Sequence, residues 1–268
     1  QVVITARDRT RTCELLDLYG LAYRTVGGAY GRGMWHKVTG TIGRARQLAA
    51  AMRGSGCTVS FGHGSRALPL ASRLLGIPSV TMYDYEWVNP RLFNLFCQAI
   101  LLPDAIGPDR CREAGIRVDR VVGFPGLKEE LYLAGSPLAA AAVAADLGLR
   151  DDAVAVLLRP PATDAHYHNA EAEVILDAVL ARLSAIPGVD LVYMARSSDQ
   201  TAILARHAFE RVIVPEKVYD GPSLIAAMDL VIGGGGTMTR EAAVLGISAC
   251  SFFRGHLGRV DERLQRDG

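Results

Sequence analysis

The sequence predicts an α/β protein with two doubly wound domains, each a parallel sheet with helices on both faces. Short apolar runs typical of buried strands alternate with amphipathic segments along the chain. Several of these runs end in glycine-rich turns, the most pronounced at residues 233–236. The alternation is interrupted between residues 124 and 136, where no clean periodicity is visible. We therefore expect two domains, 1–126 and 127–268.

The predicted elements follow one another in a regular order. Strands are expected over residues 2–5, 22–26, 58–61, 79–82, 100–102 and 121–122 in the first domain, and over 153–158, 230–232 and 247–253 in the second. Helices are expected near residues 10–19, 37–52, 67–75, 91–98 and 108–114, before 149, and from 237 onward.

Composition limits the classes of function. Half of the 268 residues are apolar and the formal net charge is +1, which argues against broad nucleic-acid binding. The sequence shows no apolar run of membrane-spanning length and no signal peptide. The five cysteines are scattered and never form a CxxC pair, as expected in a reduced, cytoplasmic compartment without a metal framework.

The most informative stretch covers residues 228–246. An apolar strand is broken by four glycines, and helical spacing begins at Thr237 and ends at Gly246. A helix that begins at such a turn directs free N–H groups and the positive end of its dipole at the glycines. Without Cβ atoms, the turn lets an anion approach that backbone closely. This predicts a phosphate site at Gly234, Gly235 and Gly236.

The turn departs from two known phosphate motifs. A P-loop needs Lys-Ser/Thr at the helix start, and a third glycine of G-x-G-x-x-G would fall on Met238 or Thr239. The hydroxyls of Thr237 and Thr239 are candidate donors to a phosphate oxygen, and Glu241 is a candidate acceptor from the vicinal hydroxyls of a ribose. In the alternative interpretation the glycines only make a tight turn and Glu241 is a solvated helix residue.

Further candidates follow other strands, because ligands of such sheets bind at the carboxyl ends of the strands. Arg159 ends the first strand of the second domain, where its guanidinium is a candidate to bind a diphosphate. Alternatively, it is an ordinary surface arginine. His63 and Ser65 follow one strand of the first domain, and Ser65 alternatively caps the next helix. Asp84 and Glu86 follow the next strand and are candidates for a base, for binding sugar hydroxyls or for pairing with an arginine.

A metal site is disfavoured. His166 and His168 flank Tyr167 in a polar loop, but no third ligand lies nearby in the sequence. No Ser-His-Asp or Cys-His set is apparent in the linear order either.

Several segments together resemble one protein family. They lie at residues 3–8, 62–65, 75–79, 126–132, 158–160 and 232–243. On these motifs nearly the whole chain resembles a bacterial and archaeal family known as domain of unknown function three-five-four. That family is similar to GT-B glycosyltransferases such as the peptidoglycan enzyme MurG, and to UDP-N-acetylglucosamine 2-epimerase. The resemblance implies a GT-B fold, two Rossmann-like domains facing a cleft, with a nucleotide-sugar in the second domain and no obligatory metal or cofactor.

The resemblance also assigns roles to residues. It implies that the glycine turn and Thr237 bind the diphosphate and that Glu241 binds the ribose. It also implies that backbone groups of residues 214–218, ending at Val218, recognise the base. The first domain would face the acceptor. It is expected to lack its first strand and helix, because the chain begins at what resembles the second strand.

Two departures concern the chemistry. The epimerases carry an aspartate directly after the His-Gly pair, where this chain has Ser65, and their next strand ends in His-x-Glu instead of Tyr83-Asp84-Tyr85-Glu86. This weakens the epimerase interpretation. His63, Asp84 and Glu86 remain the catalytic candidates, and the loop that faces the acceptor in MurG-like transferases has no counterpart in the sequence.

We therefore expect a metal-independent glycosyltransferase that moves a sugar from a nucleoside-diphosphate donor, expected to be UDP-linked, to an unknown acceptor. Lipid- and glycan-linked molecules are candidates for that acceptor. The alternatives are an NDP-sugar 2-epimerase or hydrolase, and a nucleotide-sugar-binding protein without catalysis. Neither nucleic acid nor a transmembrane segment is expected. The location would be cytoplasmic, with peripheral attachment at the inner membrane face left open.

Overall fold

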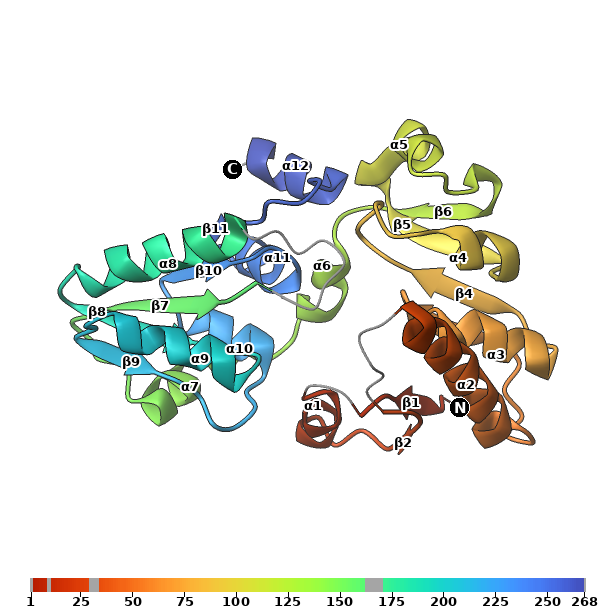
Figure 1. Cartoon of the computed structure of the whole chain (residues 1–268), viewed down its shortest axis with the longest axis horizontal. Coiled ribbons are helices and arrows are strands. Elements are labelled where there is room, and N and C mark those ends of the chain that lie inside the picture. The colour runs from red at the N-terminus through yellow and green to blue at the C-terminus, as the bar shows by residue number, and fades with distance from the viewer. Residues whose placement is uncertain (1, 9–10, 29–33, 162–170, 268) are drawn as a thin grey trace. The chain divides into compact units, whose positions relative to one another are not determined.

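The computed structural model describes residues 2–8, 11–28, 34–161 and 171–267. The chain forms two compact units (Figure 1). Unit 1 is Gln1–Leu127 with Gly258–Arg263, and unit 2 is Lys128–Leu257 with Leu264–Gly268. None of the helices in the described ranges is long and apolar enough to cross a membrane.

Unit 1 contains two parallel sheets. The first has the order β1-β2 and the second has the order β3-β4-β5-β6. The elements are β1 (Ile4–Ala6), α1 (Thr12–Leu18), β2 (Tyr23–Thr25), α2 (Met34–Met52), β3 (Ser60–His63), α3 (Ala67–Leu75), β4 (Ser79–Met82), α4 (Arg91–Phe96), β5 (Ala99–Pro103), α5 (Gly107–Glu113) and β6 (Val121–Phe124), with short 3-10 helices at Asp104–Ile106 and Val118–Arg120. The sequence pattern had indicated a single sheet here, since alternation predicts strands but not which strand edges pair.

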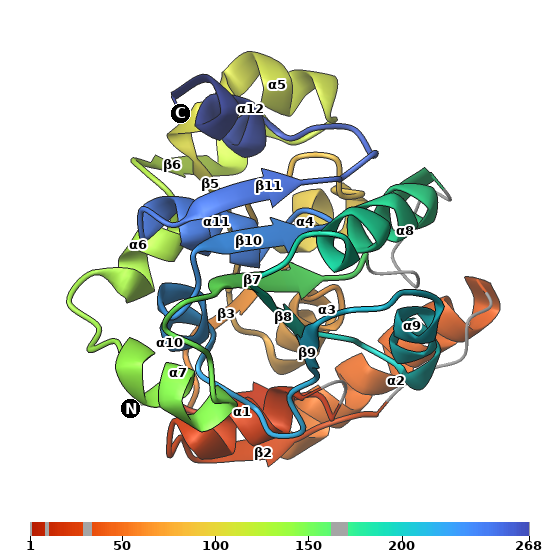
Figure 2. The ribbon, with the colours of Figure 1, turned by 90° about the vertical axis from the view of Figure 1, so that its left-hand side faces the viewer.

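Unit 2 is built on one parallel sheet with the order β11-β10-β7-β8-β9 (Figure 2). Its elements are α6 (Lys128–Leu133), α7 (Ala140–Leu147), β7 (Val154–Arg159), α8 (Glu171–Ser184), β8 (Val189–Tyr193), α9 (Ser198–Ala202), β9 (Arg211–Ile213), α10 (Gly221–Ala226), β10 (Leu230–Gly233), α11 (Thr237–Val244) and β11 (Ser248–Ser251), with a 3-10 helix at Ile203–Arg206. The last helix, α12 (Arg259–Asp267), begins in unit 1.

The sheet of unit 2 is covered on both faces, because β7 is apolar at five consecutive positions, Val154–Leu158, whose side chains point alternately to the two faces. Val156 and Leu158 join the cluster formed with α8, which includes Leu180. Ala155 and Leu157 join the opposite cluster, to which α7 and α10 contribute. Each fully buried leucine stabilises the fold by roughly 1.5–3 kcal/mol. Two-sided burial is what a doubly wound parallel sheet requires, so the predicted α/β class is confirmed.

Candidate functional site

The glycine turn joins β10 to α11 at the carboxyl edge of the unit 2 sheet. Gly235 and Gly236 have φ values of +84° and +101°, a region that residues with a Cβ rarely adopt. A Cβ on Gly234 would lie 2.9 Å from the Cα of Pro161, and one on Gly235 would lie 3.0 Å from the Cβ of Phe253. A Cβ added to Gly236 would meet no atom of the described residues within 4 Å. Packing therefore explains the first two glycines, while the third borders open space.

The start of α11 is exposed in the part of the chain that the structure describes. Gly236 is the N-cap residue, and in the structure it has no side-chain cap among the described residues. Gly235, Gly236 and Thr237 are exposed. The Thr239 hydroxyl donates to the Gly236 carbonyl at 2.9 Å, so in this structure it closes the turn. Backbone N–H groups at an exposed, uncapped helix start are the arrangement that binds phosphate in many proteins.

Arg159 is the last residue of β7 and lies directly opposite Gly233 in the sheet register. Its Nη1 donates to the Sδ of Met238, in the first turn of α11, at 3.2 Å. Burial lowers the pKa of the guanidinium to about 10, with a further contribution from the positive charge of Arg196, while Glu241 acts in the opposite direction. The hydrogen bond of the guanidinium among the described residues goes to a thioether, which is a weak acceptor, so an anion at this place would be stabilised.

Glu241 lies one helical turn into α11 and is only 7% exposed. Its Oε1 accepts a hydrogen bond from the Tyr132 hydroxyl of α6 at 2.7 Å. Burial raises the pKa of the Glu241 carboxyl above its usual value, and the bond from Tyr132 opposes that shift. Tyr132 thus fixes one carboxylate oxygen.

Sequence reasoning missed α6 as part of this site. The Nζ of Lys128, its first residue, donates to the Thr237 hydroxyl at 3.3 Å and pairs with the carboxylate of Glu129. Residues 126–132 were recognised as one of the resembling segments, but no role was attached to them. The available signal was the rarity of lysine, since Lys128 is one of three in the chain.

Val218 lies in the loop between β9 and α10, where it is half-buried. Its neighbour Lys217 pairs with Asp146 at 2.7 Å, and Asp220 caps α10 by accepting from the Ser223 N–H at 2.9 Å. The loop is therefore held at both sides of Val218. Its expected role in base reading remains a proposal.

Unit 1 brings His63 and Asp84 together. His63 ends β3 and Asp84 follows the neighbouring strand β4, with 3.8 Å between Nε2 and Oδ1. The His63 side chain is half exposed, whereas Asp84 is 8% exposed. A buried carboxylate beside an exposed imidazole is an arrangement that supports a general base. Helix α3 begins at Ala67 without a side-chain cap, so Ser65 does not cap it.

Glu86 lies differently from what a catalytic role requires. It is completely buried, its Oε1 accepts from the backbone N–H of Arg259 at 2.9 Å, and Arg110 Nε lies 3.4 Å away. Burial raises the pKa of this carboxyl. The carboxylate fixes the first residue of α12, and these contacts favour a structural role for Glu86, whereas His63 and Asp84 remain the catalytic candidates.

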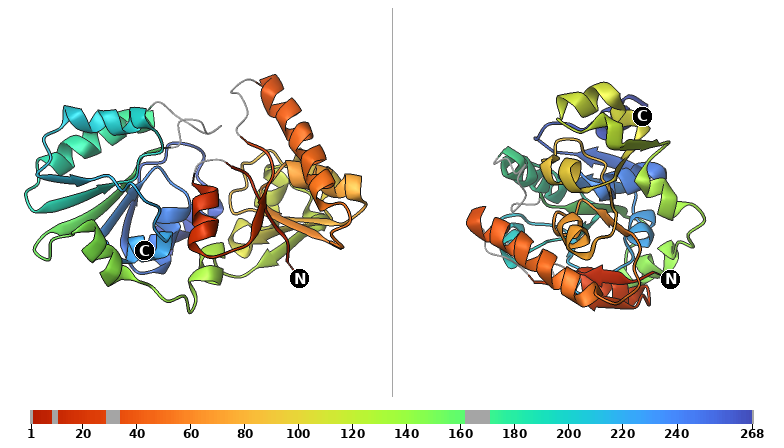
Figure 3. Two further views of the ribbon diagram at one scale, coloured as in Figure 1. Left: turned by 90° about the horizontal axis from the view of Figure 1, so that it is seen from below. Right: turned by 90° about the vertical axis from the view of Figure 1, so that its right-hand side faces the viewer.

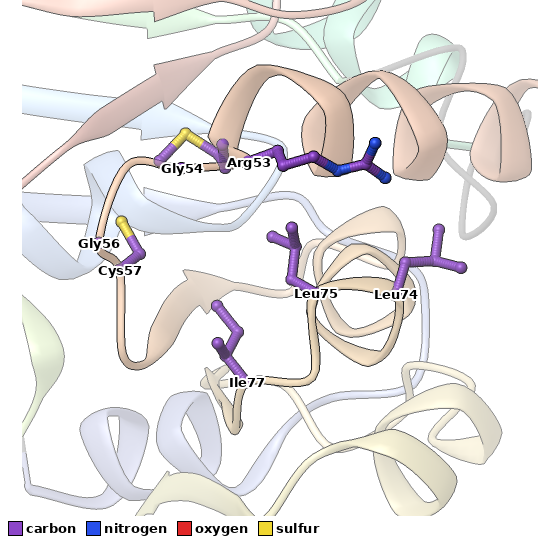
Figure 4. A pocket seen from close by; sticks show the side chains of 8 residues that line it. Arg53, Gly54, Gly56, Cys57, Leu74, Leu75 and Ile77 are labelled. Carbon is purple, nitrogen blue, oxygen red and sulfur yellow. The ribbon is translucent and has the colours of Figure 1, made fainter.

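A cavity of about 240 Å³ in unit 1 lies away from these residues. It is formed where α2 and α3 end, before β3 and β4 begin, so it opens at the amino ends of the strands (Figure 4). It is lined by Met52, Arg53, Gly54, Gly56, Cys57, Leu74, Leu75 and Ile77. Ligands of parallel sheets bind at the opposite edge, so the cavity is separate from the candidate site.

Within the described ranges, no three His, Cys, Asp or Glu side chains gather as a metal site. His166 and His168, the histidines weighed as metal ligands, lie outside the described residues.

Comparison with known proteins places the chain in a family. The model of the family described as "Protein of unknown function (DUF354)" matches residues 1–267. The chain belongs to the DUF354 family. A relative is the uncharacterized protein MJ0665 of Methanocaldococcus jannaschii, which is 26% identical over 270 residues, covering 98% of this chain and 77% of the relative. The resemblance inferred from the sequence motifs is thereby confirmed.

Solved structures confirm the fold of this DUF354 chain. MnaA of S. aureus with UDP matches with a TM-score of 0.73 at 13% identity, over 98% of this chain and 74% of MnaA. The UDP-GlcNAc 2-epimerase of Neisseria meningitidis, bound to UDP-GlcNAc, matches with 0.63 at 14%, over 98% and 85%. Anabaena HepE with UDP and glucose matches with 0.54 at 17%, over 88% and 69%. At these identities the likeness establishes the GT-B-like α/β fold.

Proposed function

We propose that this protein is a GT-B-type glycosyltransferase that uses a nucleoside-diphosphate sugar, UDP-linked, as donor. The observation that carries the proposal is the carboxyl edge of the unit 2 sheet. There an exposed helix start without a side-chain cap among the described residues lies beside Arg159, which donates to a thioether, and is followed by the buried Glu241. In support, proteins of similar fold are named in complex with UDP, UDP-GlcNAc, or UDP and glucose.

Each part of the ligand has a proposed partner. The N–H groups at Gly235, Gly236 and Thr237 receive the diphosphate, to which Arg159 adds a positive charge. Glu241 accepts from the ribose hydroxyls through the oxygen that Tyr132 leaves unbound. The backbone near Val218 reads the base.

Glycosyl transfer requires stabilisation of the departing nucleoside diphosphate. As the bond between the anomeric carbon and the phosphate oxygen breaks, negative charge accumulates on the diphosphate. The dipole of α11 and Arg159 are proposed to stabilise that charge without a metal ion. In unit 1, His63 is proposed to accept the proton of the acceptor hydroxyl, with Asp84 stabilising the imidazolium that results. The hydroxyl oxygen then forms the new bond to the anomeric carbon.

A second candidate is an NDP-sugar 2-epimerase or hydrolase, favoured by the likeness to a protein named UDP-GlcNAc 2-epimerase. Such an activity needs acid and base groups in unit 1, where Ser65 replaces the expected aspartate and Glu86 is occupied by α12. A nucleotide-sugar-binding protein without catalysis is the third alternative.

One experiment separates the three functions. First, UDP and a panel of UDP-sugars are titrated into the protein by calorimetry, in EDTA and in magnesium buffer. Each UDP-sugar that binds is then incubated with the protein, with and without lipid- or glycan-linked acceptors. A transferase releases UDP in the presence of an acceptor, and a hydrolase releases it without one. An epimerase changes the sugar's proton NMR spectrum, and a pure binding protein leaves every sugar unchanged. Failure of all UDP ligands to bind would contradict the proposal, and binding that needs magnesium would contradict metal independence.

We also propose peripheral attachment at the inner membrane face, where a lipid-linked acceptor would be found. Residues 1–75 carry eleven Lys or Arg and three Asp or Glu. On α2, Trp35, Val38 and Ile42 are 80%, 47% and 43% exposed, and Figure 3 (left) shows this helix extending beyond the strands of unit 1. Exposed apolar side chains among basic residues suit an anionic bilayer surface. Trp35→Ser should reduce sedimentation with anionic vesicles, whereas the control Val174→Ser on α8 should not.

A further inference from the structure

Two cations reach consecutive residues in the first turn of α11 from different elements. Arg159, at the end of β7, bonds to Met238, and Lys128, at the start of α6, bonds to Thr237. A cation beside a helix start is repelled by the positive end of the helix dipole, so a lysine does not stay there without an opposing interaction.

That opposing interaction is Glu129. Its carboxylate is 1% exposed and pairs with the ammonium of Lys128, whose side chain is 11% exposed. The other carboxylate oxygen, Oε2, has no hydrogen-bond partner among the described residues. Burying a carboxylate with one oxygen unsatisfied is costly. A role in holding the Lys128 ammonium at the start of α11 explains why the Glu129 carboxylate is buried there.

We infer that Lys128 is a ligand-binding residue that selects a diphosphate over a monophosphate, and that Glu129 is its positioning residue. The inference rests on the proposed function and adds to it that the site recognises the charge of the second phosphate. The backbone N–H groups at the helix start and Arg159 are sufficient to bind one phosphate. A second phosphate brings at least one further negative charge, for which Lys128 supplies the second cation.

The other acidic side chains near the start of α11 are hydrogen-bonded to other groups and do not replace Glu129 as the ion-pair partner of Lys128. Glu241 faces the same region from α11, but its Oε1 is bonded to Tyr132, and Asp220 is used in capping α10. A purely structural role of the Lys128–Glu129 pair, holding α6 against α11, predicts a loss of stability without a change in ligand preference. The two roles are therefore separable by experiment.

The test compares the affinities for UDP and UMP by calorimetry in EDTA. Lys128→Met should weaken UDP binding by about 10- to 100-fold, the loss expected for a hydrogen-bonded charge, and UMP binding by less than about threefold. The ratio of the two affinities should therefore fall by at least a few-fold. Lys128→Arg should largely restore it, because the charge is kept. Arg182→Met, the control at an exposed cation on α8 of unit 2, should leave the ratio unchanged.

Lys128→Met leaves the Glu129 charge buried without its cation, so the variant is at risk of unfolding. The double variant Lys128→Met with Glu129→Gln removes both charges and should melt close to the wild type while the UDP preference stays low. An unchanged affinity ratio in the folded double variant overturns the inference and leaves the proposed function standing. If the wild type binds neither UDP nor UMP, the proposed function fails first.

Discussion

Arg159 Nη1 and Met238 Sδ lie 3.2 Å apart, although the two residues are separated by 79 positions in the chain. The contact joins the end of β7 to the first turn of α11, which the parallel pairing of β7 with β10 brings to the same edge of the sheet. A thioether is a weak acceptor, so the guanidinium keeps most of its capacity to bind an anion.

Arg159→Met should separate binding from stability. Burial already opposes the charge of Arg159, so the unliganded variant should melt at or above the wild-type temperature. UDP affinity should fall by about 10- to 100-fold, because a charge-assisted hydrogen bond is lost. Thermal unfolding and calorimetry with UDP measure the two effects. Arg182→Met on α8 is the matched control, and an equal loss of affinity there would contradict a specific role for Arg159.

Gly236→Ala tests the turn against a glycine with the same backbone constraint. Gly236 and Gly246 have φ values of +101° and +72°, and an added Cβ meets no atom within 4 Å at either. Each substitution should cost about 1–3 kcal/mol of folding free energy through backbone strain. Only in Gly236→Ala does the added methyl group lie at the start of α11. At a temperature where both variants are folded, Gly236→Ala should therefore bind UDP more weakly than Gly246→Ala. Equal affinities would show that the glycine serves only the turn.

Glu241→Gln should change the pH dependence of stability. Burial raises the folded-state pKa of the Glu241 carboxyl above its ordinary value. Its contribution to stability is therefore fully present below the ordinary pKa and is lost as the pH rises through the folded-state pKa. The unliganded variant should therefore melt above the wild type at neutral pH, with the gap closing below about pH 4.5. Melting curves between pH 4 and pH 8 measure this, and a gap independent of pH would contradict it.

The same substitution tests the ribose assignment. Glu241→Gln should weaken UDP binding by roughly 1–3 kcal/mol and 2′,3′-dideoxy-UDP binding much less, because that ligand has no hydroxyls to donate. Equal losses for both ligands would place Glu241 elsewhere in the site.

His63→Asn and Glu86→Ala should fail in different ways. His63 is half exposed, so its replacement should leave the melting temperature nearly unchanged while UDP release from the best UDP-sugar falls by about 100-fold or more. Glu86→Ala removes the acceptor of the Arg259 N–H and should destabilise unit 1 by about 1–3 kcal/mol. Turnover per folded molecule should be kept. Normal turnover in His63→Asn would remove it from the reaction.

The sequence patterns predicted those features that depend on near neighbours. β4 has the predicted bounds of 79–82, and α11 begins at Thr237, because an apolar run and a glycine break are local signals. The glycine turn was placed at the right edge by the rule for parallel sheets. Its bond from Thr239 to Gly236 was not foreseen, because threonines at a helix start serve a ligand or the turn equally well.

Features that depend on distant partners were not predictable in this way. Tyr132 and Glu241 are 109 positions apart, and Glu86 and Arg259 are 173 apart. Helix α6 has six residues, too few for a clear helical period, so its contribution to the site went unnoticed. The division of unit 1 into two sheets depends on which strand edges pair, which periodicity does not encode.

During synthesis β7, β8 and β9 leave the ribosome before β10, yet β10 pairs with β7 and lies between it and β11. Until β10 arrives, β7 is an edge strand whose unpaired backbone groups can recruit another chain. The pairing that covers this edge also brings the glycine turn beside Arg159. Completion of the sheet and assembly of the proposed anion-binding surface are therefore one event in the maturation of the chain. A folding delay at this step would leave nascent chains both aggregation-prone and unable to be rescued by nucleotide.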